Sequence, residues 1–96
     1  MTTTHRTPTW SRRRPTHQMV WTRSMAGDRG PVTMVLTITY SWDRRGIRVD
    51  DAWEIVDGNG LREFEVYREH VRVRDAGAAW EERSRTLEEQ GWARLS

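Results

Sequence analysis

The sequence predicts an α+β fold: a four-stranded antiparallel meander followed by one C-terminal helix packed on the apolar face of the sheet (β-β-β-β-α). Three observations lead to this prediction. Residues 32–42 alternate large apolar side chains with mostly Thr and Ser, which is typical of a strand with one buried face. Connections rich in Gly, Pro, Asp and Asn separate this run from its neighbours. A helical apolar stripe then occupies residues 76–90.

Composition limits the chain to one small domain of modest stability. It has 96 residues, six of them Trp, and it has no Cys for disulfides or thiolate metal sites. All sixteen basic residues are Arg. Residues 1–30 hold six Arg and one Asp, whereas residues 31–96 hold ten Arg and thirteen acidic residues. Any attraction to phosphate is therefore expected to reside near the N-terminus.

We expect residues 1–16 to form a disordered basic arm and residues 17–96 to form the domain. The arm contains Pro, Thr and Arg and has little apolar surface to bury. Its Arg12, Arg13 and Arg14 suit phosphate, and Trp10 suits stacking on a base. The alternatives are a solvated tail or an upstream extension of a chain that starts at Met19 or Met25.

The first two hairpins are predicted from alternating apolar and polar residues in the strands and from Gly- and Pro-containing connections between them. Residues 17–25 alternate weakly and predict the first strand, and residues 26–31 connect it to the strand at 32–42. Residues 43–46 form the next turn. The third strand then faces the second in one well-specified register, since a slip of one residue would expose the apolar row. The expected pairs are Trp42–Ile47, Tyr40–Val49, Ile38–Asp51, Leu36–Trp53 and Met34–Ile55.

Asn59-Gly60 predicts a type I′ turn between the third and fourth strands. In the pairing that follows from this turn, two apolar cross-strand pairs are flanked by two pairs of opposite charge, which favours this alignment. A β-bulge at residues 68–70 would then return the later Val residues to the core. A helix over residues 61–71 is the competing interpretation. The expected pairs are Asp57–Arg62, Ile55–Phe64, Trp53–Val66, Asp51–Arg68, Val49–Val71 and Ile47–Val73.

The C-terminal helix is expected to run from Ala76 to Gln90, with Asp75 as its N-cap. Gly91 predicts a left-handed stop, after which Trp92 would pack back on Leu87. The last four residues are expected to add a short segment at a sheet edge.

The second face of the sheet is rich in Thr and is a candidate partner surface. Val35, Thr37, Val56 and Tyr67 form its expected centre, for a protein partner or a second copy of the chain. The alternative is a solvated face, which is common in antiparallel sheets.

Asp51 is a carboxylate on the apolar face of the predicted sheet. With Tyr40, Arg68 and His70 it could line a small-ligand pocket. The alternative, which we favour, is an Asp51–Arg68 ion pair at the rim of the core or a local bulge that turns Asp51 outward. The chain contains no nucleophile, phosphate-loop or metal-ligand motif, so we expect no enzyme, metal or cofactor.

Three functions remain open at this level. The first is a non-catalytic module that binds nucleic acid through the arm. The second is a protein–protein adaptor, inhibitor or assembly protein that docks through the Thr-rich face or a sheet edge. The third is the small-ligand pocket. Since no apolar run is long enough to span a membrane, we expect a cytoplasmic protein.

Overall fold

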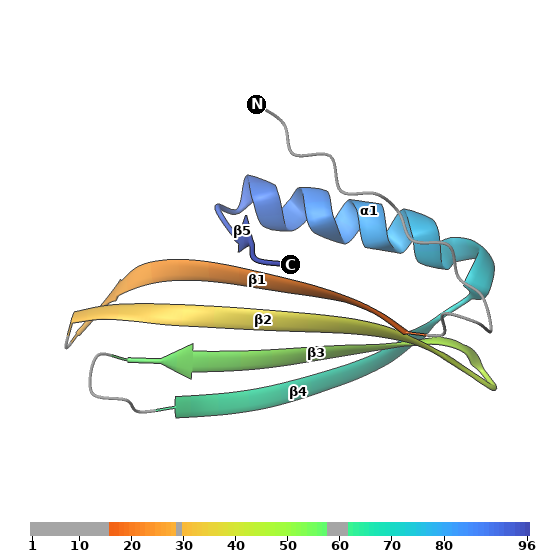
Figure 1. The fold of residues 1–96 in the computed structure, drawn as a ribbon, viewed down its shortest axis with the longest axis horizontal. Helices are drawn as coiled ribbons and strands as arrows, with labels where there is room; N and C mark the ends of the chain where they lie inside the picture. The colour runs from red at the N-terminus through yellow and green to blue at the C-terminus, as the bar shows by residue number, and fades with distance from the viewer. Residues whose placement is uncertain (1–15, 29, 58–61) are drawn as a thin grey trace.

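The computed structural model describes residues 16–28, 30–57 and 62–96, without the side chains of residues 62 and 63. Four long strands, β1 (Thr16–Gly27), β2 (Gly30–Asp43), β3 (Gly46–Val56) and β4 (Arg62–Val71), precede helix α1 (Val73–Glu89) and the short β5 (Ala93–Arg94). The sheet is antiparallel in the order β4-β3-β2-β1-β5 (Figure 1). The predicted α+β meander is thus confirmed, with β5 as a fifth strand.

The register between β2 and β3 is the predicted one. All five expected pairs are present, from Met34–Ile55 to Trp42–Ile47. On the other side of β2, β1 places Met19 opposite Ile38 and Trp21 opposite Leu36. One face of the three strands therefore carries a continuous apolar surface, as the alternation requires.

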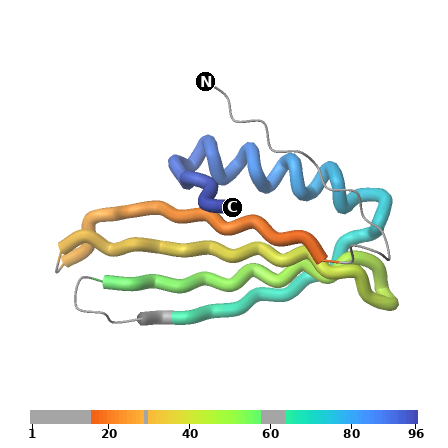
Figure 2. The backbone as a smooth tube through the Cα atoms, viewed as in Figure 1, coloured from red at the N-terminus to blue at the C-terminus, as the bar shows by residue number. Residues whose placement is uncertain are grey.

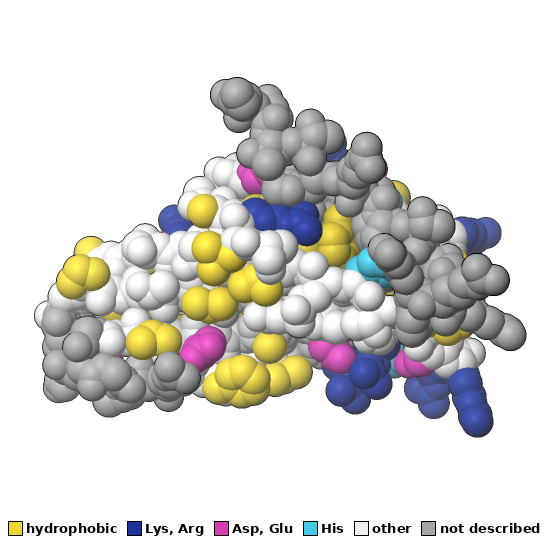
Figure 3. All heavy atoms as spheres, viewed as in Figure 1, with side chains coloured by type: hydrophobic (Ala, Val, Ile, Leu, Met, Phe, Trp, Pro, Cys, Tyr) yellow, Lys and Arg dark blue, Asp and Glu magenta, His cyan; other side chains and the backbone are white. Residues whose placement is uncertain are grey.

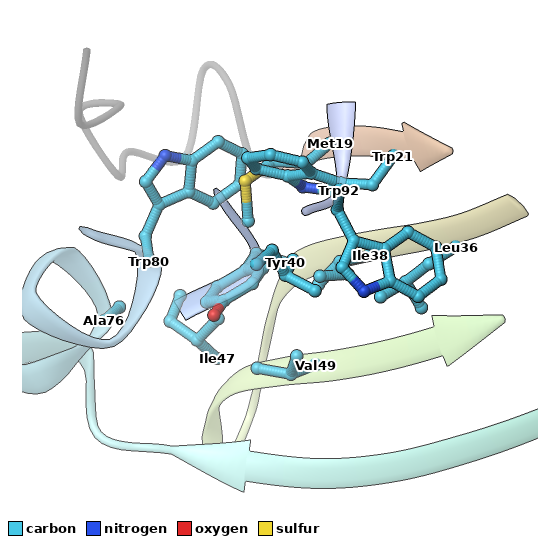
Figure 4. Packing of buried hydrophobic residues seen from close by; sticks show 11 residues of the cluster. Met19, Trp21, Leu36, Ile38, Tyr40, Ile47, Val49, Ala76, Trp80 and Trp92 are labelled. Atoms are coloured by element: carbon cyan, nitrogen blue, oxygen red, sulfur yellow. The ribbon is translucent and has the colours of Figure 1, made fainter. Parts of the chain in front are cut away.

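Helix α1 lies against this surface and completes a two-layer core. In Figure 4, Trp80 of α1 points toward Tyr40 of β2, and their rings meet edge to face with centroids 5.1 Å apart. Trp92, beyond the helix, meets Trp53 of β3 in the same way at 5.7 Å. Both distances are typical of favourable aromatic pairs. The buried core comprises Met19, Trp21, Leu36, Ile38, Tyr40, Ile47, Val49, Ala76, Trp80, Leu87 and Trp92.

The predicted register of β4 is wrong by one residue before the predicted bulge and by two residues after it, where Val49 pairs with Glu69 and Ile47 with Val71; the bulge itself is absent. The two strands form ten consecutive pairs, from Val56–Arg62 to Ile47–Val71. This uninterrupted ladder brings Val71 to the core face without an extra residue. It also moves Phe64 and Val66 to the opposite face, where they lie across from Glu54 and Ala52.

The error has a physical cause. We placed Phe64 and Val66 inward because the Asn59-Gly60 turn and the flanking pairs of opposite charge favoured that alignment. Residues 64–70 are instead exposed along the whole strand, so burial does not select their register. The Asn59-Gly60 turn itself lies outside the described residues. The alternative helix over residues 61–71 is also wrong, because residues 62–71 form β4.

The helix begins three residues earlier than predicted and ends at Glu89, one residue before the predicted end. It starts at Val73 after Arg72, whose side chain makes no capping hydrogen bond, so Asp75 lies in the first turn and is not the N-cap. Gly91 has φ of +87°, a conformation that favours glycine. The Trp92 amide then donates to the Leu87 carbonyl at 2.9 Å, which turns the chain back toward the sheet.

The C-terminal residues cover part of the β1 edge. Thr22 pairs with Ala93, and Trp21 pairs with Arg94. The Leu95 amide donates to the Val20 carbonyl at 2.7 Å, and the Val20 amide donates to the Ser96 carbonyl at 3.0 Å. The predicted edge segment is therefore confirmed.

Candidate functional site

Five basic side chains gather at one end of the sheet, at the turn between β2 and β3. They surround a surface depression of about 360 Å³ that Asp43 also lines. Figure 3 shows Arg side chains gathered at the end of the molecule where this turn lies, apart from a band of hydrophobic side chains. We call this group the basic end; it comprises Arg44, Arg45, Arg48, Arg68 and His70.

The turn itself projects two of these residues. Its last residue is Gly46, with φ of +123°, and a Cβ there would lie 2.8 Å from the Val71 carbonyl oxygen. The Arg45 amide donates to Asp43 Oδ1 at 2.7 Å and closes the turn. Arg44 and Arg45 are thereby held exposed at its tip.

Acidic residues organise the basic end but do not neutralise it. Asp50 accepts from Arg48 Nε at 3.1 Å and from Arg68 Nε at 2.7 Å. Asp43 lies 3.0 Å from His70 Nε2. The Arg45 amide, and then the hydrogen bond with His70, lower the pKa of Asp43. Four Arg against Asp43 and Asp50 leave a net positive site.

The predicted arm joins the domain at this same end. Thr16 pairs with Ser41, Ser41 with Arg48, and Arg48 with His70, so one row of residues links β1 to β4. Figure 2 shows the start of β1 at the end of the sheet where β2 turns into β3. Trp10 and Arg12 to Arg14 lie outside the described residues.

An aromatic hollow adjoins the basic depression. It has a volume of about 490 Å³ and is lined by Trp42, Val73 and Gly46 as well as by Asp43 and Arg44, which line both hollows. Trp42 is only partly buried against the core. Charged and aromatic side chains are therefore adjacent at this turn.

The predicted pocket around Asp51 is only partly assembled. Tyr40 and Asp51 lie on the helix side of the sheet, but Arg68 and His70 lie on the other face, because of the β4 register. The partner of Asp51 is Arg83 of α1, whose Nη2 lies 2.9 Å from Oδ2. Among the described residues no donor meets Asp51 Oδ1, which is buried. The expected Asp51–Arg68 ion pair is thus replaced by two ion pairs, one on each face of the sheet. Asp51 pairs with Arg83 on the helix side, and Asp50 pairs with Arg68 on the Thr-rich face.

Tyr40 lies beside this ion pair. Burial raises its pKa to about 12; the positive charge of Arg83 opposes the increase, and the negative charges of Asp51 and Glu69 add to it. Its hydroxyl is therefore protonated at neutral pH.

The predicted partner surface on the Thr-rich face is corrected at one residue. Val35, Thr37 and Val56 lie on that face, but Tyr67 pairs with Asp51 and lies on the helix side. There its hydroxyl donates to Glu65 at 2.8 Å, which raises the pKa of the phenol. Phe64 and Val66, which we had placed inward, take its place on the Thr-rich face.

Sequence reasoning missed the basic end. Its members are spread from residue 44 to residue 70, in a segment whose net charge is negative, so a charge count along the chain conceals them. The confirmed β2–β3 register places Arg48 opposite Ser41, next to the turn, and was the available signal.

No protein-family model, curated protein or solved structure matches the chain. Within residues 16–28, 30–57 and 62–96 there is no group of three or more His, Asp or Glu side chains arranged to hold a metal ion. None of the helices in that part of the chain has the length and apolar character needed to cross a membrane.

Proposed function

We propose that the protein binds single-stranded nucleic acid at the basic end, together with the arm. The observation that carries this proposal is the gathering of four Arg and His70 at the end of the sheet from which residues 1–15 extend. Arg12 to Arg14 and the Arg residues of the turn can then contact successive phosphates of one strand.

Two further features favour a single strand over a duplex. The hollow with Trp42 offers an aromatic surface to an unpaired base directly beside the phosphate-binding Arg residues. Helix α1 carries acidic residues on exposed positions, including Glu81, Glu82, Glu88 and Glu89, which oppose its entry into a groove of DNA.

The test is binding of a fluorescent oligonucleotide, single-stranded or duplex, over a range of salt. Contacts from Arg12 to Arg14, Arg44, Arg45 and Arg48 predict a slope of log affinity against log salt of about −4 for a single strand. A chain that starts at His17 loses three of these contacts, so its slope should fall to about −2.

Charge-reversal variants separate a local site from general attraction. Arg44→Glu with Arg45→Glu should abolish binding at physiological salt, because both residues are exposed at the turn. The matched control is Arg23→Glu with Arg85→Glu, which changes the net charge equally at exposed positions away from the turn. Equal loss in both double variants, or no binding by the unmodified chain at low salt, would refute the proposal.

Protein docking on the Thr-rich face is the second candidate. The exposed Phe64 and Val66 on that face favour it. A salt-independent interaction that survives removal of residues 1–16 would support this function instead.

A further inference from the structure

Strand β4 is a long edge with a neighbour on one side only. It ends the strand order, and all ten of its residues pair with β3. Within the described part of the chain, no strand lies on its other side. An unpaired edge presents backbone amides and carbonyls that can accept another strand.

Exposed apolar side chains are concentrated on this strand. Phe64 is 67% exposed, Tyr67 58% and Val66 52%. Phe64 and Val66 lie on the Thr-rich face, whereas Tyr67 lies on the helix side between Glu65 and Glu69, so the strand has no continuous apolar face to bury against its own helix. Exposure of several large apolar groups at one edge indicates a contact surface.

Strand β4 has charged side chains, which are one of the usual protections of a free edge, but it lacks several others. Residues 62–71 include no Pro, Gly or Lys, and the ladder has no bulge. The opposite edge, β1, is covered by β5 and the C-terminal residues at Val20 to Thr22. Among the residues that the structure describes, part of one edge is therefore covered and the other edge has no strand beside it.

We propose that a second copy of this chain pairs with β4, antiparallel and centred on Val66. This register sets Val66 opposite its own copy, Phe64 opposite Arg68 and Glu65 opposite Tyr67. An Arg beside an aromatic ring is favourable, and Glu65 already accepts a hydrogen bond from Tyr67 within each strand.

Charge favours this register over the two adjacent symmetric ones, because its like-charge pairs lie farthest from the axis. Centring on Glu65 sets two carboxylates directly opposite each other, and centring on Tyr67 sets Glu65 opposite Glu69, so both are repulsive. The register centred on Val66 leaves two symmetry-related like-charge pairs, between positions 63 and 69, three residues from the axis and near the ends of the ladder, and it sets Arg62 opposite His70. The resulting dimer joins two five-stranded sheets, with both helices on one side and both Thr-rich faces on the other.

Cysteine cross-linking tests the register directly, because the chain has no Cys of its own. In the proposed dimer the two Val66 Cα atoms are about 4.5 to 5.5 Å apart, within the range of a disulfide. The two Phe64 Cα atoms are about 14 Å apart, too far for one. Mild oxidation of Val66→Cys should give mostly disulfide-linked dimer on a non-reducing gel, whereas Phe64→Cys should give no more than the exposed control, Met25→Cys.

Solution mass provides the second measurement. Light scattering should give twice the chain mass of 11.4 kDa for the full chain and for Met25→Lys. Val66→Lys should give the monomer mass, since it sets two ammonium groups opposite each other, and its circular dichroism should stay unchanged because Val66 is exposed. A monomer mass for the full chain at all concentrations, or equal cross-linking of Val66→Cys and Met25→Cys, would overturn the dimer. Neither result depends on nucleic acid, so the dimer and the proposed function can fail separately.

Discussion

Tyr40→Phe should make the stability of the protein far less sensitive to alkaline pH. Tyr40 is 3% exposed, packs against Trp80 and has a pKa of about 12 in the folded protein. In the unfolded chain a Tyr has a pKa of about 10. The folded state therefore holds this proton more tightly than the unfolded state.

The sign and size follow from linkage. Because the folded pKa is raised, the stabilisation is fully present below pH 10 and is lost as the pH rises toward 12. The free energy of unfolding should fall by about 1.4 kcal/mol between pH 9 and pH 11, and by about 2 kcal/mol by pH 12.

The composition makes this measurement unusually direct. The chain has no Lys and no Cys, so its two Tyr are the side chains whose ordinary pKa lies between 9 and 12. Urea unfolding at pH 9, 10 and 11, with phenolate absorbance at 295 nm, would follow both stability and ionisation. The matched control is Tyr67→Phe, at an exposed position.

Tyr40→Phe should lose most of the pH dependence, and Tyr67→Phe should retain most of it. If Tyr40 ionises near pH 10 in the folded protein, or if the two variants respond alike, Tyr40 is not buried beneath the helix as described.

Two further predictions concern the contact between helix and sheet. Trp80→Ala should lower the free energy of unfolding by about 3 to 5 kcal/mol, because it leaves a cavity at a buried site. Trp80→Phe should lower it clearly less, because an aromatic ring remains. Urea unfolding of both variants measures the two losses, and equal losses would mean that ring packing is not the cause. Asp51→Asn and Arg83→Met should show a coupling of about 1 to 2 kcal/mol in a double-mutant cycle, between the values for exposed and buried pairs, and additive losses would contradict the ion pair.

Much of the fold could be predicted because strong local patterns agree with burial. The alternation in residues 32–42 defines both the strand and its inward face, and the β2–β3 register follows because a slip would expose the apolar row. The end of the helix at Gly91 and the return of Trp92 follow from the conformational freedom of glycine.

The candidate site could be predicted only in part. Asp51 and Tyr40 are neighbours because their strands have the predicted register. Arg68 and His70 were assigned to the wrong face, since β4 has charged and apolar residues on both faces and its pattern does not select one. Only Arg68 joins Arg44, Arg45 and Arg48 through the β4 register, and a charge count along the chain does not show this.

By itself, the sequence determined the α+β class, the order of the elements, the inward face of β2 and β3, and the C-terminal turn onto the β1 edge. These features follow from periodicity and from residues with restricted backbone conformations. Only the tertiary structure decided the register of β4, the partner of Asp51 and the position of the basic end. Those features depend on contacts between segments that are distant in the sequence, namely between β3 and β4 and between the helix and the sheet. Local patterns and propensities do not determine such contacts.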